Sequence, residues 1–594
     1  MTPLNPAGLS AASLGAGGLR GLAWLRRRIR SSELWLIAVA TLVGAVAGSL
    51  AVLQGRIAHG LQLLLFGFDP DERLSAQAMI APHQALFIPL GGLTLGLVTW
   101  IWLRYRPRPA VDPVEANALH GGRMSVRDSL FICLQTLMSN GSGASVGLEA
   151  AYAQSGAMVA SFAGQKLNLR RNDLRTLVGA GAGAAIGAAF GAPLTGAFYA
   201  FEIVIGAYTV ANIAPVGAAT LAAVLMAKSL GWAPYLLKTS TVAVQNWAEY
   251  GLYALLGLVC AAFGIALMRT VAVAESWVSS SPIPRLLRPA LGGLGLAALA
   301  LITPQTLSAG HGALNLDLEA RLGLFALVAL LAMKSVASIV SLATGFRGGL
   351  FFAALFLGVL LGQAFAAIIA LIPGATTVDP TVAAFVGMAG LGVAIVGGPF
   401  TMSFLVLEAT GDFTVTAAAL TASLIASAVV REIFGYSFST WRLHLRGETI
   451  RSAHDVGWVR TLTAERMMRK GVQTISDDAT LADFRSRFPL GSTRRVLMVD
   501  ADGRYAGVIP TSDAYIQAED LQTPVANLAI NRDVALSAAM SIKEIMAAFD
   551  ATETDELAVI DEDRKVLGVV SEAYATRRYA EELEKARRDL TGES

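Results

Sequence analysis

Charged side chains are scarce in this sequence, at 15% of its 594 residues, whereas hydrophobic residues make up 54%. Soluble proteins carry about 25% charged residues, so the composition excludes an ordinary soluble protein and predicts that most of the chain lies in a membrane. The 46 basic and 44 acidic residues leave a net charge of +2. This balance does not indicate a nucleic-acid partner.

Cysteine and histidine are also rare. The only cysteines are Cys133 and Cys260, both in apolar runs, and the six histidines show no metal-ligand spacing. We therefore expect no disulfide and no metal site. Hydrolysis would need paired catalytic groups or a metal, so we expect no catalytic residues and do not interpret the chain as an enzyme.

Apolar runs alternate with short polar breaks from residue 34 to about residue 435. The arginine-rich segment 26–30 precedes the first run, 34–53, and predicts a cytoplasmic N-terminus. Several later runs are short or contain glycine and proline, which predicts broken helices, because irregular backbone survives in a membrane only inside protein or beside a water-filled cavity. The other expected segments are 85–104, 127–139, 150–164, 176–207, 210–230, 251–272, 289–303, 321–343, 350–372, 381–408 and 414–433.

Two sequence matches indicate a duplicated half. GAPLTGAFYAFE (191–202) aligns with GGPFTMSFLVLE (397–408) at an offset of 397 − 191 = 206. GLEAAY (147–152) aligns more faintly with GLFFAA (349–354) at an offset of 349 − 147 = 202. Membrane transporters often contain inverted repeats with the substrate site at their interface, where broken helices direct their positive N-termini at an anion.

After about residue 440 the sequence becomes polar. VLMVDADGRYAGVIPTSD (496–513) and LAVIDEDRKVLGVVSEAY (557–574) share a strand, an acidic turn and a second strand at an offset of 561 − 500 = 61. They predict a tandem α/β module on the cytoplasmic side. The expected domains are an N-terminal arm (1–33), a membrane domain (34–445), a linker (446–460), two α/β modules (461–518 and 519–580) and a charged tail (581–594).

From about residue 34 to residue 578, the sequence resembles the CLC family of chloride channels and proton-coupled anion exchangers. The resemblance implies an all-α polytopic membrane domain with inverted repeats and broken helices, followed by a cytoplasmic α/β pair of CBS domains. It also implies a homodimer in a bacterial inner or plasma membrane, with one pathway per subunit. The segments that carry it are NGSGASVGLEA (140–150), VGAGAGAAIGAAFGAPLTGAFYAFE (178–202), GFRGGLFFAALFLG (345–358) and GGPFTMSFLVLE (397–408).

The family segment G-[RK]-E-G-P corresponds to 147–151, and its gating glutamate corresponds to Glu149. The resemblance implies that this carboxylate occupies the anion path and then swings out or takes up a proton, so that opening depends on pH. The alternative is a buried carboxylate that caps a helix. Backbone groups in the two matched segments are the expected anion ligands, at Gly147, Leu148, Ala150, Gly349, Leu350, Phe351 and Phe352.

Two anion-binding side chains of the family are absent here. Its G-S-G-I-P motif corresponds to PAVDP (109–113), which places Ala110 at the serine and Asp112 nearby. The central tyrosine of the family corresponds to Ser439, whose hydroxyl is the expected replacement. Tyr436 is the candidate if the register differs.

Other departures concern charge. Leu148 stands where the family has a cation, and we expect Arg347 either to compensate or to reach the membrane interface. Ile203 stands where family exchangers usually carry a second glutamate, and isoleucine cannot relay a proton. Glu202 and Glu408 occupy equivalent positions in the two repeats, which favours a structural role at helix ends over transport.

CBS pairs often bind adenine nucleotides through G-h-h-[ST]-x-x-D. Here GVIPTSD (507–513) offers Thr511 and Asp513, and GVVSEAY (568–574) offers Ser571 without the aspartate. Each pattern is incomplete, so we expect a structural role and no cofactor, with an adenine nucleotide as the alternative.

We therefore expect transport of chloride or a related anion, by a gated passive channel. Proton-coupled antiport is the alternative within the family. A divalent-cation transporter would need clustered carboxylates or carbonyls. A sensor that does not transport would be excluded by measurable anion flux.

Overall fold

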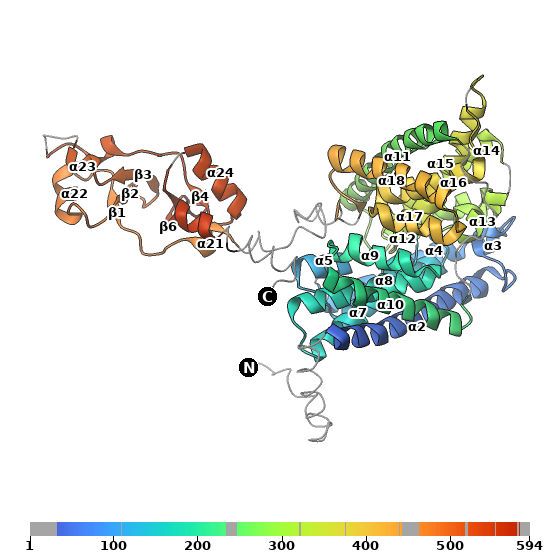
Figure 1. Ribbon diagram of the computed structural model, residues 1–594. Helices are drawn as coiled ribbons and strands as arrows, with labels where there is room; N and C mark the ends of the chain where they lie inside the picture. The colour runs from blue at the N-terminus through green and yellow to red at the C-terminus, as the bar shows by residue number, and fades with distance from the viewer. Residues whose placement is uncertain are drawn as a thin grey trace, which may run out of the picture. The chain divides into compact units, whose positions relative to one another are not determined.

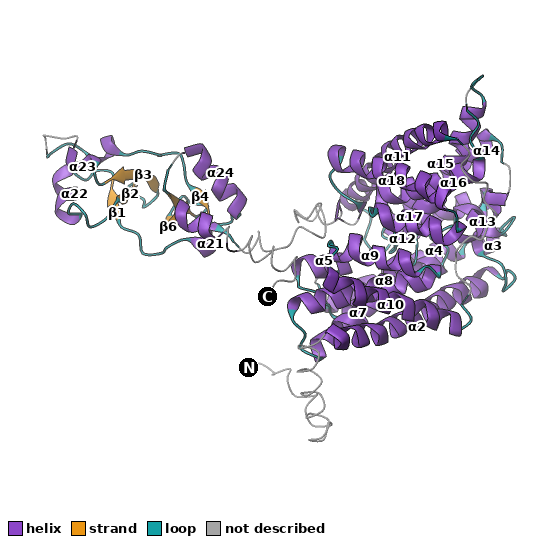
Figure 2. Ribbon diagram, in the orientation of Figure 1, coloured by secondary structure: helices purple, strands orange, loops and turns teal. Residues whose placement is uncertain are grey.

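The computed structural model describes residues 33–107, 110–232, 246–319, 322–374, 376–438, 440–441, 462–516, 521–552, 554–578 and 581. These residues belong to two units, divided between Asp455 and Val456, inside the expected linker. Unit 1 is helical, and the strands of the described residues all lie in unit 2 (Figure 2).

Unit 1 contains helices of bilayer length. A transmembrane helix needs about 20 apolar residues, and seven helices of the described residues are long and apolar enough to span. These are 33–66, 82–105, 210–229, 247–280, 324–344, 351–370 and 413–433. The chain is therefore an integral membrane protein with several spans, as its composition predicts.

Two of the expected segments are broken. The segment 176–207 bends at Gly191, whose φ is +67°, and its residues 200–205 form a π-helical turn, which agrees with the expected broken helices. The segment 381–408 likewise breaks at Gly397 and Gly398, with φ values of +88° and +74°. Glycine adopts these left-handed conformations without the steric cost of a Cβ.

The elements of unit 1 form two similar series. The first is α2 (Glu33–Phe66), η1 (Leu74–Ala76), α3 (Pro82–Ala85), α4 (Phe87–Tyr105), α5 (Pro113–Leu119), α6 (Val126–Gly141), α7 (Glu149–Lys166), α8 (Arg171–Phe190), α9 (Pro193–Tyr199), η2 (Ala200–Ile205) and α10 (Val210–Ser229). The second is α11 (Trp247–Ser280), α12 (Arg288–Ile302), η3 (Pro304–Thr306), α13 (His311–Glu319), α14 (Leu324–Thr344), α15 (Phe351–Ala370), α16 (Pro380–Val396), α17 (Pro399–Thr410) and α18 (Phe413–Ile433).

Helix packing follows the repeat. In the first half, α2 packs against α8 and α10, and α7 packs against α8; in the second half, α11 packs against α16 and α18, and α15 packs against α16. Figure 1 shows most of the first half below the second, with α3 and α4 beside the second half, where they pack against α12, and with α9 and α17 adjacent where the halves meet. The broken helices therefore lie at the interface between the repeats.

Glycine pairs let the central helices approach closely. A Cβ on Gly156 of α7 would clash with the backbone of Gly181 in α8, and a Cβ on Gly358 of α15 would clash with Gly387 in α16. The offsets are 358 − 156 = 202 and 387 − 181 = 206, so the same contact occurs in both halves. Small residues at such crossings permit the close packing on which membrane helix association depends.

Unit 2 contains two equivalent three-stranded sheets. β1 (Thr474–Ser476) pairs in parallel with β2 (Arg495–Val499), which pairs antiparallel with β3 (Tyr505–Pro510); β4 (Leu536–Ser537), β5 (Glu556–Ile560) and β6 (Val566–Ser571) repeat this order. β5 follows β2 by 556 − 495 = 61 residues, as the sequence repeat predicts. The remaining elements are α21 (Ala464–Met467), α22 (Leu481–Arg487), α23 (Asp513–Ile516), η4 (Val525–Leu528) and α24 (Ile542–Thr552).

The acidic turns of unit 2 explain its aspartates. Asp500 Oδ1 accepts hydrogen bonds from the amides of Asp502 and Arg504, and Asp561 Oδ1 accepts them from Asp563 and Lys565. Such side-chain bonds close a tight turn between two strands. The aspartates therefore hold the β2–β3 and β5–β6 hairpins.

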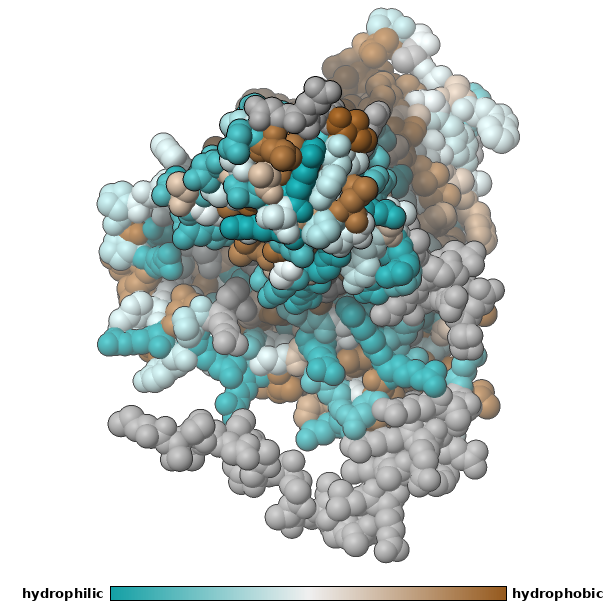
Figure 3. Space-filling model, turned by 90° about the vertical axis from the view of Figure 1, so that its left-hand side faces the viewer, coloured by the Kyte–Doolittle hydropathy of each residue, from teal (hydrophilic) through white to brown (hydrophobic). Residues whose placement is uncertain are grey.

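Unit 1 has an extensive apolar surface. In unit 1, large apolar side chains are exposed on several helices, including Leu64 at 80%, Val210 at 89%, Trp277 at 81% and Phe325 at 89%. Figure 3 shows brown hydrophobic areas beside teal hydrophilic ones on one face of the molecule. An apolar surface of this extent in a soluble protein would favour association, whereas in unit 1 it faces lipid.

Candidate functional site

The two repeats meet at a pair of glycines. The Gly147 amide donates to the Gly349 carbonyl at 2.9 Å, and the Gly349 amide donates to the Gly147 carbonyl at 3.4 Å. α7 begins two residues after the first glycine, at Glu149, and α15 begins two residues after the second, at Phe351. This bridge therefore brings together two helix N-termini, whose free amides and dipoles favour an anion.

The Glu149 carboxylate lies at these helix starts. It is 4% exposed, and it interacts with the backbone amides of Glu149 itself and of Phe352. Its Oε2 atom is buried and has no hydrogen-bond partner among the described residues. A Cβ at Gly147 would overlap Oε2, so glycine at this position leaves room for the carboxylate in its present rotamer.

Aromatic rings surround the start of α15. The Phe190 ring lies 5.4 Å from that of Phe351 and 6.0 Å from that of Phe352. The Tyr199 ring, at the end of α9, lies 6.2 Å from that of Phe351. The Tyr199 phenol also interacts electrostatically with Asp112 and Glu149.

Sequence analysis missed Tyr199. The available signal was the internal repeat, because position 199 corresponds to 199 + 206 = 405, where the second half has Leu405. Tyr199 therefore has a hydroxyl that its counterpart Leu405 lacks, and this difference marks a position where the two halves differ chemically. Only the tertiary structure shows that this side chain lies beside Phe351 at the start of α15.

The predicted residues on the first anion motif have a local role. Ala110 lies in the loop before α5, and Asp112 is the N-cap of that helix, since its Oδ1 accepts from the Glu115 amide at 2.8 Å. The carboxylate of Asp112 therefore stabilises a helix start, in addition to its electrostatic interaction with Tyr199.

The predictions for the central tyrosine position have different outcomes. Ser439 lies outside the described residues. The alternative, Tyr436, packs in an aromatic cluster, with its ring 6.3 Å from that of Phe434 and 5.4 Å from that of Trp441.

Arg347 is half-buried, and its backbone amide donates to Ser139 Oγ at 2.9 Å. This contact fixes the backbone two residues before Gly349.

Glu202 and Glu408 cap helices across the repeat interface. Glu202 accepts hydrogen bonds from the amides of Phe400 and Thr401 and from the Thr401 hydroxyl, at 3.1, 2.8 and 2.6 Å. Glu408 makes the same three contacts with Leu194 and Thr195, at 2.8, 2.9 and 2.6 Å. These are the helix-end contacts that the repeat predicts.

Ile203 lies in the π-helical segment η2 and packs against the turn before α17. A Cβ on Gly398 would lie 3.2 Å from Ile203 Cδ1, and one on Gly397 would lie 3.6 Å from it. The Ile203 side chain thus makes apolar contacts beside the Glu202 cap. A glutamate at this position would need hydrogen-bond donors in place of these apolar contacts.

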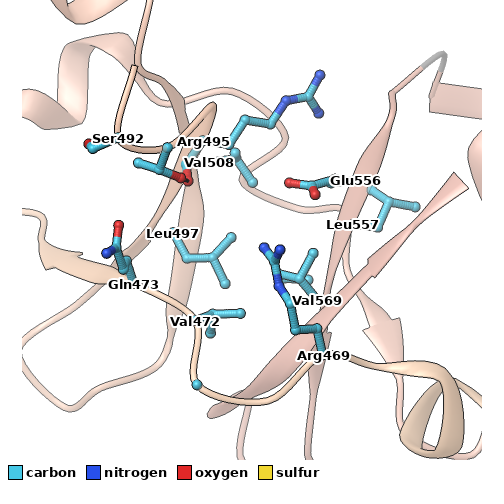
Figure 4. A pocket seen from close by; sticks show the side chains of 13 residues that line it. Arg469, Val472, Gln473, Ser492, Arg495, Leu497, Val508, Glu556, Leu557 and Val569 are labelled. Atoms are coloured by element: carbon cyan, nitrogen blue, oxygen red, sulfur yellow. Dashed lines mark hydrogen bonds between the residues drawn. The ribbon is translucent and has the colours of Figure 1, made fainter. Parts of the chain in front are cut away.

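Unit 2 contains a cleft of about 320 Å³ between its two sheets, lined by Arg469, Gln473, Arg495 and Glu556 among others (Figure 4). Arg495 Nη2 pairs with Asp555 at 3.3 Å, whereas its Nη1 is buried without a hydrogen-bond partner among the described residues.

The predicted nucleotide residues do not line this cleft. Thr511 is buried beyond β3, Asp513 begins α23 and Ser571 ends β6. The sequence pattern and the cleft therefore identify different parts of unit 2.

Comparison with protein families gives two matches. The family model described as "Voltage gated chloride channel" matches residues 94–431, and the CBS domain model matches residues 525–581. The first match covers more than half of the chain and includes both halves of the bridge between the repeats.

Among curated proteins, the chain is 34% identical over 391 residues to a "Putative chloride channel protein ClcB-like" of Ralstonia nicotianae, covering 64% of this chain and 90% of that protein. It is 30% identical over 405 residues to the "Voltage-gated ClC-type chloride channel ClcB" of Salmonella typhi, covering 66% and 95%.

Two solved structures share the fold. A slow cyanobacterial Cl⁻/H⁺ antiporter superposes with a TM-score of 0.61 at 20% identity, covering 69% of this chain and 97% of that one. A eukaryotic CLC transporter gives a TM-score of 0.59 at 17% identity, covering 93% and 98%.

Proposed function

Because the chain belongs to the voltage-gated chloride channel (CLC) family, we propose that it moves chloride or a related anion across a membrane, along a path that the Glu149 carboxylate gates. The observation that carries this proposal is the position of that carboxylate on the Phe352 amide at the start of α15. A halide ion and a carboxylate compete for such a donor. When the side chain leaves, the donor is free for the anion.

Backbone donors suit this role. The amides at the starts of α7 and α15 provide a partial positive field without a full cation, so an anion binds there weakly enough to leave again. We propose Gly147, Leu148 and Ala150 on one side, and Gly349 to Phe352 on the other, as the backbone around this position. Protonation of Glu149 removes its charge and weakens its hold on the Phe352 amide.

We propose that Tyr199 provides the side-chain hydroxyl of the path. Ala110 has no hydroxyl, and the Tyr199 phenol interacts with Glu149 and packs against Phe351. A Tyr199→Phe variant keeps the ring and loses the hydroxyl. We expect it to change the ratio of chloride to nitrate flux while its thermal stability stays close to that of the unaltered protein. An unchanged ratio would exclude the hydroxyl as a ligand.

Within the family, we propose passive chloride conduction, with proton-coupled antiport as the alternative. Ile203 supports the passive mode, since it lies in apolar packing and has no proton to exchange. The test is chloride efflux from liposomes with external pH recorded at the same time. Chloride efflux without proton movement supports the channel. Uphill proton uptake driven by a chloride gradient supports the antiporter, and absence of any anion flux contradicts both.

We also propose that the protein is a homodimer with one path per subunit, in a bacterial inner or plasma membrane, with its N-terminus and CBS pair in the cytoplasm. The support is family membership together with the apolar helices of unit 1. Chemical crosslinking in native membranes tests the dimer, and protease access to unit 2 in right-side-out and inverted vesicles tests the orientation.

For unit 2 we propose a structural role, with an adenine nucleotide in the cleft as the alternative. Arg469 and the buried Nη1 of Arg495 favour an anionic ligand there. Titration of the full-length protein with ATP, followed by calorimetry, tests this. Binding that is lost in an Arg469→Gln variant supports the alternative, and no heat of binding at millimolar ATP supports the structural role.

A further inference from the structure

A small polar pocket lies directly beside the gate segment. Its lining includes Leu148, the residue before Glu149, together with His59, Arg73 and His311. Its volume is about 20 Å³, which is room for a single water-sized particle. The pocket therefore suits one partly dehydrated ion and is too small for an organic ligand.

The charges around this pocket are positive. Arg73 interacts electrostatically with both His59 and His311, and Lys334 also interacts with His311. No aspartate or glutamate is among the described residues that line the pocket. Arginine keeps its charge at any physiological pH, so the lining of the pocket always includes a cation.

Lys334 is a second cation close to the pocket, behind the lining residue Ser308. Its side chain is 0% exposed, and its Nζ atom donates to the carbonyls of Thr306, Leu307 and Ser308 at 3.2, 3.4 and 2.8 Å. Three acceptors match the three protons of an ammonium group. No ion pair found among the described residues includes Lys334, so its charge has no counter-ion from the protein there.

The wall of the pocket is held rigidly. Ser308 Oγ accepts from Gln62 at 3.3 Å and from Asn140 at 3.1 Å, and Gln62 also donates to the Asn140 side chain at 3.0 Å. This network joins α2 and α6 to the loop after η3. A rigid polar wall lowers the cost of ordering groups around a bound ion.

Two residues that line the pocket, His311 and Leu148, connect it to the gate. The His311 ring lies 3.7 Å from the Phe352 ring, and the Phe352 amide is the donor that holds the Glu149 carboxylate. Leu148 makes the second connection, since it precedes Glu149 in the chain. An ion in the pocket would thus lie adjacent to the position that the Glu149 carboxylate occupies.

We propose that this pocket is an anion-binding subsite beside the gate, in which Arg73, backed by Lys334, replaces the cation that the family pattern has at position 148. The proposal rests on the proposed anion transport. It also explains how a chain with Leu148 can attract anions to its gate. It gives this role to Arg73, whereas sequence analysis considered Arg347 for it, with the membrane interface as the alternative, and Arg347 does not line the pocket.

The first test is chloride flux as a function of chloride concentration, in liposomes with the full-length protein. A charged residue at the mouth of a path raises the local anion concentration by roughly 10-fold or more. We expect Arg73→Gln to raise the half-saturating chloride concentration about 3-fold to 10-fold with little change in maximal flux. Addition of Leu148→Arg to this variant should restore the original value, because the charge returns to the same place.

The matched control is Arg104→Gln, at an exposed arginine of α4 that packs over Trp100 and does not line the pocket. It should leave the half-saturating concentration unchanged. An unchanged value in Arg73→Gln, or an equal change in Arg104→Gln, would overturn the proposal.

The second test is direct and does not depend on flux or on a variant that folds. Crystals of the unaltered protein are soaked in bromide, and the anomalous signal is measured. A bromide peak in contact with Arg73 supports the subsite, and a bromide peak only at the Phe352 amide overturns it. If liposomes show no anion flux but the pocket peak is present, the proposed transport fails while the binding site stands.

Discussion

Replacement of Glu149 by glutamine tests the gate most directly. Glutamine has nearly the shape of glutamate, so it fits beside Gly147, but it carries no charge and cannot take up a proton. When the side chain swings away, its interaction with the Phe352 amide at the start of α15 is broken. Hydrogen bonds to charged groups contribute about 1.5–3 kcal/mol, whereas neutral ones contribute about 0.5–1.5 kcal/mol.

The difference of about 1–1.5 kcal/mol corresponds to a factor of about 5 to 10 in gate occupancy. We therefore expect Glu149→Gln to raise chloride efflux at pH 7 by about 5-fold to 10-fold. Efflux through the unaltered protein should increase as the pH falls, because protonation of Glu149 has the same effect as the substitution. Efflux through Glu149→Gln should be nearly independent of pH.

The assay is chloride efflux from liposomes at each half unit between pH 4 and pH 8. Glu408→Gln is the matched control, since Glu408 is another carboxylate at a helix start, but it caps α9 and lies outside the bridge between Gly147 and Gly349. It should lower thermal stability and keep the pH dependence. Equal flux in Glu149→Gln and the unaltered protein across the whole pH range would refute the gate.

Three further predictions concern stability, each checked by the thermal unfolding midpoint of the purified protein in detergent. Gly358→Ala should destabilise unit 1 by about 1–3 kcal/mol through overpacking against Gly387; an unchanged midpoint would contradict this close approach. Lys334→Met should cost about 3 kcal/mol, because three carbonyls lose their donor; a more stable variant would show that the lysine is not needed there. Asp412→Ala should cost about 1 kcal/mol through loss of the N-cap of α18, and Asp412→Asn should retain most of that stability.

Local patterns in the sequence were sufficient for much of the fold. The runs of apolar residues predict the membrane helices, because their length must match the bilayer. The offset of 61 residues predicts the two sheets of unit 2, since each turn aspartate closes its own hairpin by bonds to residues two and four positions away. Glycine and proline predict broken helices, but hydropathy does not show where the segment 176–207 breaks, because a glycine turn can interrupt a run without changing its hydropathy.

The site was predicted only in part. The matched segments GLEAAY and GLFFAA predict that Glu149 and Phe351 begin equivalent helices. Nothing in their spacing shows that Gly147 and Gly349 hydrogen-bond to each other, or that Glu202 caps α17 while Glu408 caps α9. These contacts join residues about 200 positions apart, so their partners depend on the packing of whole helices.

The sequence by itself determined what is local: which segments enter the membrane, where helices begin and which half repeats the other. The tertiary structure alone decided which groups share a cavity. Arg73, Leu148 and His311 come from three distant segments, and Tyr199 interacts electrostatically with Glu149 from a different helix. The physical reason is that periodicity and hydropathy act over a few residues, whereas the electrostatic field at the gate is a sum over every charge that packing brings near it.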